Sequence, residues 1–219
     1  MKFFLKYKNY FTYLLILILL IFLKISNPNI IKSISFLSFD LYQKIFPLRK
    51  PSSEVIIVDI DEKSLAKFGQ FPWNRSVFAK ILNNLNDANP KVIGFDIFFS
   101  ENDKQTPEEF IKAYDIKSKE LIADLRKIES HDNYFKKELK NSKSVLAILG
   151  NTEKSYSEYQ RKPKAKFLFK GGNPKEFVYK YSNSIGSLKL LEDNVNGLGS
   201  ISFLDQTDGI IRSLPLIVS

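Results

Sequence analysis

The pattern of apolar positions predicts a membrane helix near the start of the chain. Tyr10–Leu23 is almost continuously apolar, and Lys8 and Lys24 border it. This pattern is typical of a membrane helix or of a signal-peptide core, but no small-residue cleavage site follows it. Lysines at the two ends of such a run can extend their charged groups to the polar interface. We therefore predict an uncleaved transmembrane signal anchor over residues 10–25.

The segment before this anchor predicts its orientation, and the segment after it predicts a second helix. Three lysines precede the apolar run, and this charge predicts a cytoplasmic N-terminus over residues 1–9 and an exported remainder. After Pro28, apolar residues recur every three or four positions as far as Ile45, which predicts an amphipathic stalk helix over residues 29–46. The apolar stripe is short for a coiled coil. We expect it to pack against the sheet of the domain, with a homodimer as the alternative.

Residues 51–219 alternate between strand and helix patterns, which predicts one exported domain. The strand patterns are short apolar runs of the kind that form buried strands: Val55–Ile60, Val92–Phe99 and Val145–Leu149. The helical patterns between them cover 61–68, the segment from Asn74 to the stop at Asn89-Pro90, 106–129 and 132–141. Strands that are joined through helices by short connections predict parallel pairing with right-handed crossovers.

The C-terminal half has a different pattern. Alternating apolar and polar residues flank Gly171-Gly172, and a second such region surrounds Asp208-Gly209. Both regions have the signature of a β-hairpin. The predicted fold class is therefore α/β. We expect a single domain with a mainly parallel sheet that starts as βαβαβ, with β-hairpins in its C-terminal half and an N-terminal transmembrane helix in front.

Composition excludes several classes of function. The 219 residues carry a formal net charge of +9, from 33 Lys and Arg against 24 Asp and Glu. Only five of the basic residues are Arg, whereas a nucleic-acid surface would cluster Arg on one face, so no nucleic-acid partner is expected. Cysteine is absent, which excludes disulfides and thiolate chemistry. The single histidine, His131, is expected on the surface, and we predict no metal or cofactor.

Two acids at the end of the first strand pattern raise an enzymatic alternative. Asp59 and Asp61 form an Asp-x-Asp pair, which resembles the opening of the haloacid-dehalogenase phosphatases. In that family the first Asp is the nucleophile and the second is an acid/base, with Mg²⁺ bound nearby. The motif expects Thr or Val two residues after the second Asp, where this chain has Lys63. We therefore predict no catalytic residue and keep the phosphatase only as an alternative.

Five segments of the chain occur in an order and spacing that match one known family. They are Asp40-Leu41-Tyr42, Val55–Leu65 ("VIIVDIDEKSL"), Gly69–Arg75 ("GQFPWNR"), Lys91–Glu101 ("KVIGFDIFFSE") and Gly197–Leu216 ("GLGSISFLDQTDGIIRSLPL"). In these segments the sequence resembles the type-2 CHASE domain, a sensory module of bacterial cyclases, histidine kinases and related receptors. The regions 103–130 and 151–190 do not align with the family.

The resemblance implies a location, a role and partners. It implies an exported sensor domain anchored in the bacterial inner membrane by a single N-terminal span, with the lipid bilayer and an unknown small ligand or periplasmic partner as its contacts. Such domains usually continue into further membrane helices and a cytoplasmic output domain. The sequence ends at Ser219 without these segments, so the sensor domain, residues 51–219, is expected to be C-terminally incomplete.

Candidate ligand-binding residues follow from the position of the acids in the predicted sheet. Ligands of open α/β sheets bind beyond the carboxyl ends of the strands. The polar and aromatic residues expected near these ends are Asp59, Asp61, Trp73, Arg75, Asp96 and Arg212. Arg75 can pair with a carboxylate of a ligand, and Trp73 can stack on a flat group.

Each candidate also has a structural interpretation. Asp61 is well placed as the N-cap of a short helix, and Trp73 can be a core aromatic residue. Asp59 and Asp96 can be held by internal pairs with Arg75 or with Arg212. A purely architectural domain that mediates dimerisation is the third alternative for the function.

Overall fold

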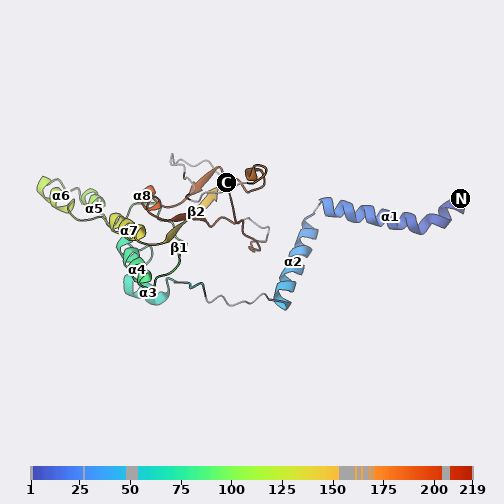
Figure 1. Ribbon diagram of the computed structural model, residues 1–219, viewed down its shortest axis with the longest axis horizontal. Coiled ribbons are helices and arrows are strands. Elements are labelled where there is room, and N and C mark those ends of the chain that lie inside the picture. Colours follow the sequence, from blue (N-terminus) through green and yellow to red (C-terminus); the bar gives the residue numbers. More distant parts are fainter. Residues whose placement is uncertain are drawn as a thin grey trace. The chain divides into compact units, whose positions relative to one another are not determined.

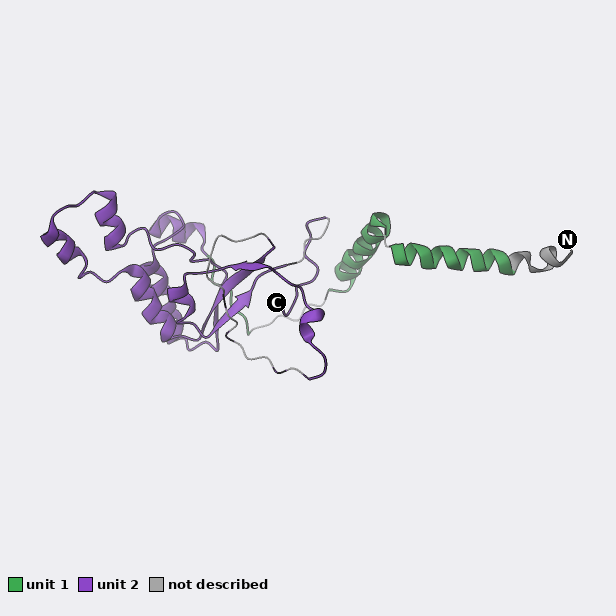
Figure 2. Cartoon of the chain, turned by 90° about the horizontal axis from the view of Figure 1, so that it is seen from above, with its two compact units in different colours: residues 1–59 green, residues 60–219 purple. Residues whose placement is uncertain are grey.

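The computed structural model describes residues 2–26, 28–47, 54–152, 161, 164, 168, 170–203 and 208–218, without the side chains of residues 2–9. The chain divides into two units, residues 1–59 and residues 60–219, and each is described by itself (Figure 2). The sequence pattern places the start of the domain at residue 51, earlier than this division.

The first unit consists mainly of two helices. Helix α1 spans Lys2–Ser26, and helix α2 spans Asn29–Ile45 after Pro28, whose extended backbone starts the second helix. A helix thus forms over almost all of the segment 29–46 in which one was predicted, and its side chains are exposed or partly exposed within the described structure. Its role as a stalk stays a prediction. Among the described residues, no single helix is both long enough and apolar enough to span a membrane. The two helical segments Tyr10–Ser26 and Asn29–Ile45 meet the criteria of length and composition only when they are taken together, and the chain bends by 83° between them.

The predicted first strand, Val55–Ile60, is not formed in the described structure. It belongs to no strand, and Ile56 and Ile57 are 85% and 88% exposed. An apolar run becomes a strand only where a neighbouring strand takes up its backbone hydrogen bonds. No strand pairing involves this run among the described residues, so the prediction of a strand here was wrong.

The second unit starts with two helices that the sequence predicts correctly. Helix α3 spans Glu62–Phe68, with Asp61 as its N-cap and with Gly69 at φ 89° at its end, a conformation that glycine adopts without strain. Helix α4 spans Arg75–Asp87, and the side chain of its N-cap, Asn74, accepts a hydrogen bond from the backbone N–H of Val77. Both helices follow from local signals, because a cap lies within a few residues of the helix that it starts.

One parallel crossover forms as predicted. Strand β1 (Ile93–Phe95) pairs in parallel with strand β2 (Ser144–Asn151). The expected helix over 106–129 is instead two short helices, and it is interrupted after Tyr114 by Asp115, whose φ is +45°. The helices of this crossover are α5 (Pro107–Ala113), α6 (Lys119–Leu125) and α7 (His131–Lys140).

Strand β2 is the centre of a mixed sheet. Strand β4 (Gly197–Ser200) pairs with it in parallel, and strand β3 (Asn183–Ile185) pairs with its far end in the antiparallel sense. A 3-10 helix (Pro174–Glu176) and helix α8 (Lys189–Glu192) complete the described elements. The fold is thus a mixed α/β domain (Figure 1).

The two predicted hairpins are not seen in the described residues. Much of the first lies among undescribed residues, and Pro174 begins a 3-10 helix rather than a returning strand. For the second, β4 pairs with β2 instead of turning back at Asp208-Gly209, and residues 204–207 lie outside the described structure. The described antiparallel pair is β2–β3, which joins segments far apart in the sequence.

Aromatic residues form the core between the sheet and helices α4 and α7. The ring of Phe99 lies 5.0 Å from Phe78 of α4 and 5.1 Å from Phe135 of α7, measured between centroids. All three rings are buried, and Leu146 of β2 is fully buried with them. Helices α4 and α7 pack against each other beside the sheet (Figure 1). Asp103, in the segment that follows β1, links their N-terminal ends, because it bonds to Arg75 and to Asp132.

Candidate functional site

A hollow of about 310 Å³ opens where β1 ends and α4 begins. Its walls are mostly apolar, with phenylalanine the commonest residue and two charged residues among them: they consist of Phe71, Pro72, Arg75, Phe78, Asp96, Ile97, Phe98 and Phe99. The hollow lies at the carboxyl end of a parallel strand, where open α/β sheets bind their ligands. Two of the six predicted ligand-binding residues, Arg75 and Asp96, are therefore brought to one place.

The alternation of the chain after β1 places Asp96 on a different face from the core. Phe95, Ile97 and Phe99 all pack in or against the core. Successive side chains of an extended segment point to opposite faces, so Asp96 and Phe98 point away from the core. Asp96 is exposed and has no hydrogen-bond or ion-pair partner among the described residues. Its carboxylate is free to meet a ligand.

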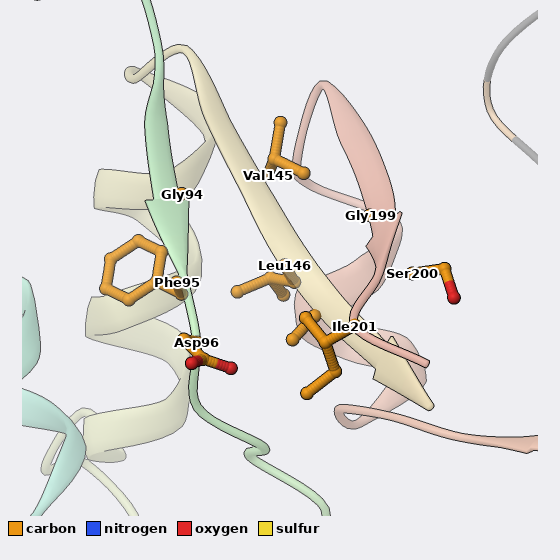
Figure 3. A pocket seen from close by; sticks show the side chains of 9 residues that line it. Gly94, Phe95, Asp96, Val145, Leu146, Gly199, Ser200 and Ile201 are labelled. Atoms are coloured by element: carbon orange, nitrogen blue, oxygen red, sulfur yellow. The ribbon is translucent and has the colours of Figure 1, made fainter. Parts of the chain in front are cut away.

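A second hollow, of about 290 Å³, lies on the open face of the sheet and shares Asp96 with the first. Figure 3 shows β1, β2 and β4 side by side, with the carboxylate of Asp96 extending from the end of β1 toward Ile201. This face carries little side-chain bulk. A methyl group added at Gly199 would lie 3.3 Å from Cγ1 of Val145, and one added at Gly94 would meet nothing within 4 Å. Asp96 thus stands between the two hollows.

Arg75 is held tightly at the first turn of α4. Its backbone N–H donates to Oδ2 of Asp103 at 2.5 Å, and its Nη2 donates to the carbonyl of Glu101 at 2.9 Å. Its guanidinium carbon lies 4.7 Å from the centroid of the Phe99 ring, in a cation–π contact. Burial lowers the pKa of Arg75, and the carboxylates of Asp132 and Asp103 act in the opposite direction.

Asp103 and Asp132 link the N-terminal ends of α4 and α7, and each is 4% exposed. The backbone N–H of Asp103 donates to Oδ2 of Asp132 at 2.9 Å, and Nδ1 of His131 lies 3.4 Å from Oδ2 of Asp103. Burial raises the pKa of Asp132, against the opposing effects of the Asp103 N–H and of Arg75. His131, which was expected on the surface, is 30% exposed, and the structure adds that it lies beside this cluster.

Two other predicted candidates have structural roles. The carboxylate of Asp61 accepts hydrogen bonds from the N–H and hydroxyl of Ser64, which confirms it as a helix cap, and these bonds lower its pKa. Trp73 is 6% exposed, and its Nε1 donates to the carbonyl of Gly69 at 2.7 Å, so it is a core residue as expected. The Trp73 ring still packs against Phe71, which lines the aromatic hollow.

The remaining two candidates, Asp59 and Arg212, are not among the residues that line the hollow. Arg212 donates from Nη1 and Nη2 to the two carboxylate oxygens of Asp208, at 3.0 and 2.7 Å, and this pairing lowers the pKa of Asp208. Asp59 belongs to the unit of residues 1–59, where it is exposed. Its role in ligand binding stays a prediction. In the described part of the chain, no three His, Asp or Glu residues are grouped so that they can hold a metal ion.

Sequence reasoning missed a second buried ion pair. Nε of Arg161 donates to Oε1 of Glu192 at 2.7 Å, and its Nη atoms donate to the carbonyls of Ser184 and Ser187. Glu192 is 1% exposed. The two charged residues are 31 positions apart, in a region without recognisable motifs. No local pattern of the sequence connects them.

Comparison with known families decides what kind of domain carries this site. Residues 13–219 match the CHASE2 domain. The chain belongs to the CHASE2 domain family. Searches of curated proteins and of solved structures found no match. CHASE2 domains are extracellular sensory domains, so the resemblance to the type-2 CHASE domain is confirmed and the chain carries a sensory domain.

The hollow of this CHASE2 domain is built from two of the segments that carry the resemblance. Gly69–Arg75 supplies Phe71 and Arg75, and Lys91–Glu101 supplies Asp96 and Phe99. A third segment, Gly197–Leu216, supplies β4 beside the second hollow. The parts of the sequence that are typical of the family thus come together around the end of β1.

Proposed function

We propose that this CHASE2 domain is the signal-input domain of a bacterial transmembrane receptor, and that it is anchored in the inner membrane with its N-terminus in the cytoplasm and its sensor domain in the periplasm. The observation that carries the proposal is the match to the CHASE2 family over residues 13–219. The ligand enters the hollow at the end of β1, where Arg75 and Asp96 line an otherwise apolar wall that is rich in phenylalanine.

The side chains of α1 support the anchoring part of the proposal. From Leu14 to Leu20 every side chain is apolar and roughly half exposed, on all sides of the helix. A helix that is apolar all round is stable only where a protein core or a lipid bilayer surrounds it. Lys8 and Lys24 border this segment, as the ends of a membrane helix require.

The state of the acids supports sensing rather than catalysis. The phosphatase alternative needs Asp61 as an acid/base, but its carboxylate already accepts two hydrogen bonds from Ser64 as a helix cap. Burial and hydrogen bonding also engage Asp103 and Asp132. Asp96 is the carboxylate in the hollow that is open to a ligand.

The orientation can be tested directly because the chain has no cysteine. We propose two single-cysteine variants of the full chain, Lys2→Cys at the N-terminus and Lys127→Cys, whose side chain is 77% exposed. A membrane-impermeant maleimide applied to intact spheroplasts should label only Lys127→Cys, and cell lysis should make both variants reactive. Labelling of Lys2→Cys alone in intact spheroplasts would show the opposite orientation. Labelling of neither variant before lysis would contradict export of the domain.

A further inference from the structure

We propose that the hollow at the end of β1 binds a small organic cation, with an ammonium group beside Asp96 and an apolar body against the aromatic wall. The inference rests on the proposed sensory function and names the class of ligand. It follows from three properties of the hollow, namely its charge, its aromatic lining and its size.

The charge of the hollow favours a cation because the charge of Arg75 is already balanced. The Arg75 Nη2 is taken by the Glu101 carbonyl, and its Nε faces Oδ1 of Asp132 at 3.6 Å. The buried carboxylate of Asp132 faces this guanidinium, and the buried Asp103 accepts from the backbone N–H of the same arginine. The positive N-terminal end of α4 is likewise satisfied by Asp103 and by the cap Asn74.

The carboxylate of Asp96 is the charged group of the hollow that no cation of the described structure balances. It is exposed, lines both hollows and has no partner among the described residues. The carboxylates around the hollow outnumber its single guanidinium, so an anionic ligand would be repelled, whereas an ammonium group gains a charge-assisted hydrogen bond. The charge complementarity of the site is therefore with a cation.

The aromatic wall provides the second half of cation recognition. Phe71 is 45% exposed and Phe98 is partly exposed, and both line the hollow. Asp96 and Phe98 are two positions apart on an extended segment, so they share a face. A carboxylate beside aromatic rings binds ammonium groups because the ring faces carry negative charge density. The rings also cover the apolar part of such a ligand.

The size of the hollow limits the ligand to a small molecule. A volume of about 310 Å³ is at the lower end of the range of ligand pockets. An amine with one ring or a short alkyl chain fits this volume, and a peptide or a polysaccharide does not. The probe chosen here is 2-phenylethylammonium, with 2-phenylethanol as its neutral counterpart and 3-phenylpropanoate as its anionic counterpart.

The test is calorimetric titration of the full chain, reconstituted in lipid nanodiscs at low ionic strength, with each of the three probes. We expect the ammonium probe to bind about tenfold more tightly than the alcohol, from one charge-assisted hydrogen bond. The carboxylate probe should show no binding. Asp96→Asn should remove the tenfold preference for the ammonium probe, and Phe98→Leu should reduce this preference, because leucine keeps an apolar contact but has no ring face.

A matched control separates the site from the overall charge. Asp87 is an exposed aspartate at the end of α4 and does not line the hollow. Asp87→Asn changes the net charge as Asp96→Asn does, and it should leave the affinity for all three probes unchanged. Thermal unfolding of each variant establishes that it is folded.

Three outcomes would overturn the inference. They are tighter binding of the carboxylate probe, an ammonium preference that survives Asp96→Asn, or an absence of binding by the ammonium probe. The maleimide labelling of Lys127→Cys remains informative in each case, because it reports anchoring and export without any ligand. Failure of the ligand class is therefore distinguishable from failure of the proposed sensory function.

Discussion

Nε of Arg75 lies 3.6 Å from Oδ1 of Asp132, and neither atom has a hydrogen-bond partner in the described structure. The pair joins the first turns of α4 and α7 in surroundings from which water is largely excluded, since the side chains are 11% and 6% exposed. Removal of one partner from a buried ion pair leaves the other charge without compensation, which costs more than the pair itself contributes.

Arg75→Met should therefore lower the free energy of unfolding by about 3 kcal/mol, because Asp132 and Asp103 then lack their cation. Adding Asp132→Asn to this variant should restore about 1–2 kcal/mol, since the neutral amide can still accept from the Asp103 N–H. Chemical unfolding of the full chain in detergent micelles measures both values. A double variant less stable than Arg75→Met alone would show that the two residues are not coupled as the geometry indicates.

The raised pKa of Asp132 predicts a specific dependence of stability on pH. Burial is the largest cause of the shift from the ordinary value of 3.8. Between 3.8 and the raised pKa the folded chain binds more protons at this group than the unfolded chain does, so its contribution to stability falls as pH rises through this window. It becomes most favourable below 3.8.

The unfolding temperature of the wild-type chain should thus increase relative to Asp132→Asn as the pH is lowered from 7 toward 4. Asp87→Asn, which removes an exposed carboxylate, should not show this change relative to the wild type. Thermal unfolding followed by circular dichroism at several pH values provides the measurement. A wild-type advantage that grows with rising pH would give the opposite sign and would contradict the assignment.

Trp73 should contribute to stability rather than to ligand selectivity. Its ring is buried among Phe68, Phe71 and Phe78, and its Nε1 is satisfied by Gly69. Trp73→Ala should lower the free energy of unfolding by about 3–5 kcal/mol, as large-to-small changes in a core do. Tyr114→Ala, at an aromatic side chain that is 70% exposed, should change it by less than about 0.5 kcal/mol. Equal effects of the two variants in chemical unfolding would show that Trp73 is not part of the core.

The features of this fold that the sequence predicts correctly are local ones. Asp61 and Asn74 were identified as caps because each lies within three residues of the N–H that it accepts from. The parallel β1–β2 crossover follows from strand and helix patterns that succeed one another along the chain. The grouping of Arg75 with Asp96 follows from the rule that ligand sites lie at the carboxyl ends of parallel strands.

The features that the sequence does not predict depend on distant partners. Val55–Ile60 has the composition of a strand, but composition does not provide the neighbouring strand that it needs. Asp115 breaks a long helical pattern through its left-handed backbone, which no apolar periodicity reveals. Arg75 was expected to pair with Asp59 or Asp96, but its partner is Asp132, at the start of a later helix. Nothing in the sequence around Asp132 indicates that this polar residue is buried.

The ion pair of Arg161 and Glu192 lies directly against Gly186, where there is no room for a larger residue. A methyl group at Gly186 would lie 2.6 Å from Oε1 of Glu192 and 2.7 Å from Nε of Arg161, both closer than carbon contacts allow. Gly186→Ala should therefore separate a buried pair and lower the free energy of unfolding by about 1–3 kcal/mol. Gly94→Ala is the matched control, since a methyl group there meets nothing within 4 Å. Chemical unfolding of the two variants should show a loss for the first and none for the second, and equal stability of both would mean that the Arg161–Glu192 pair does not need the space that Gly186 leaves.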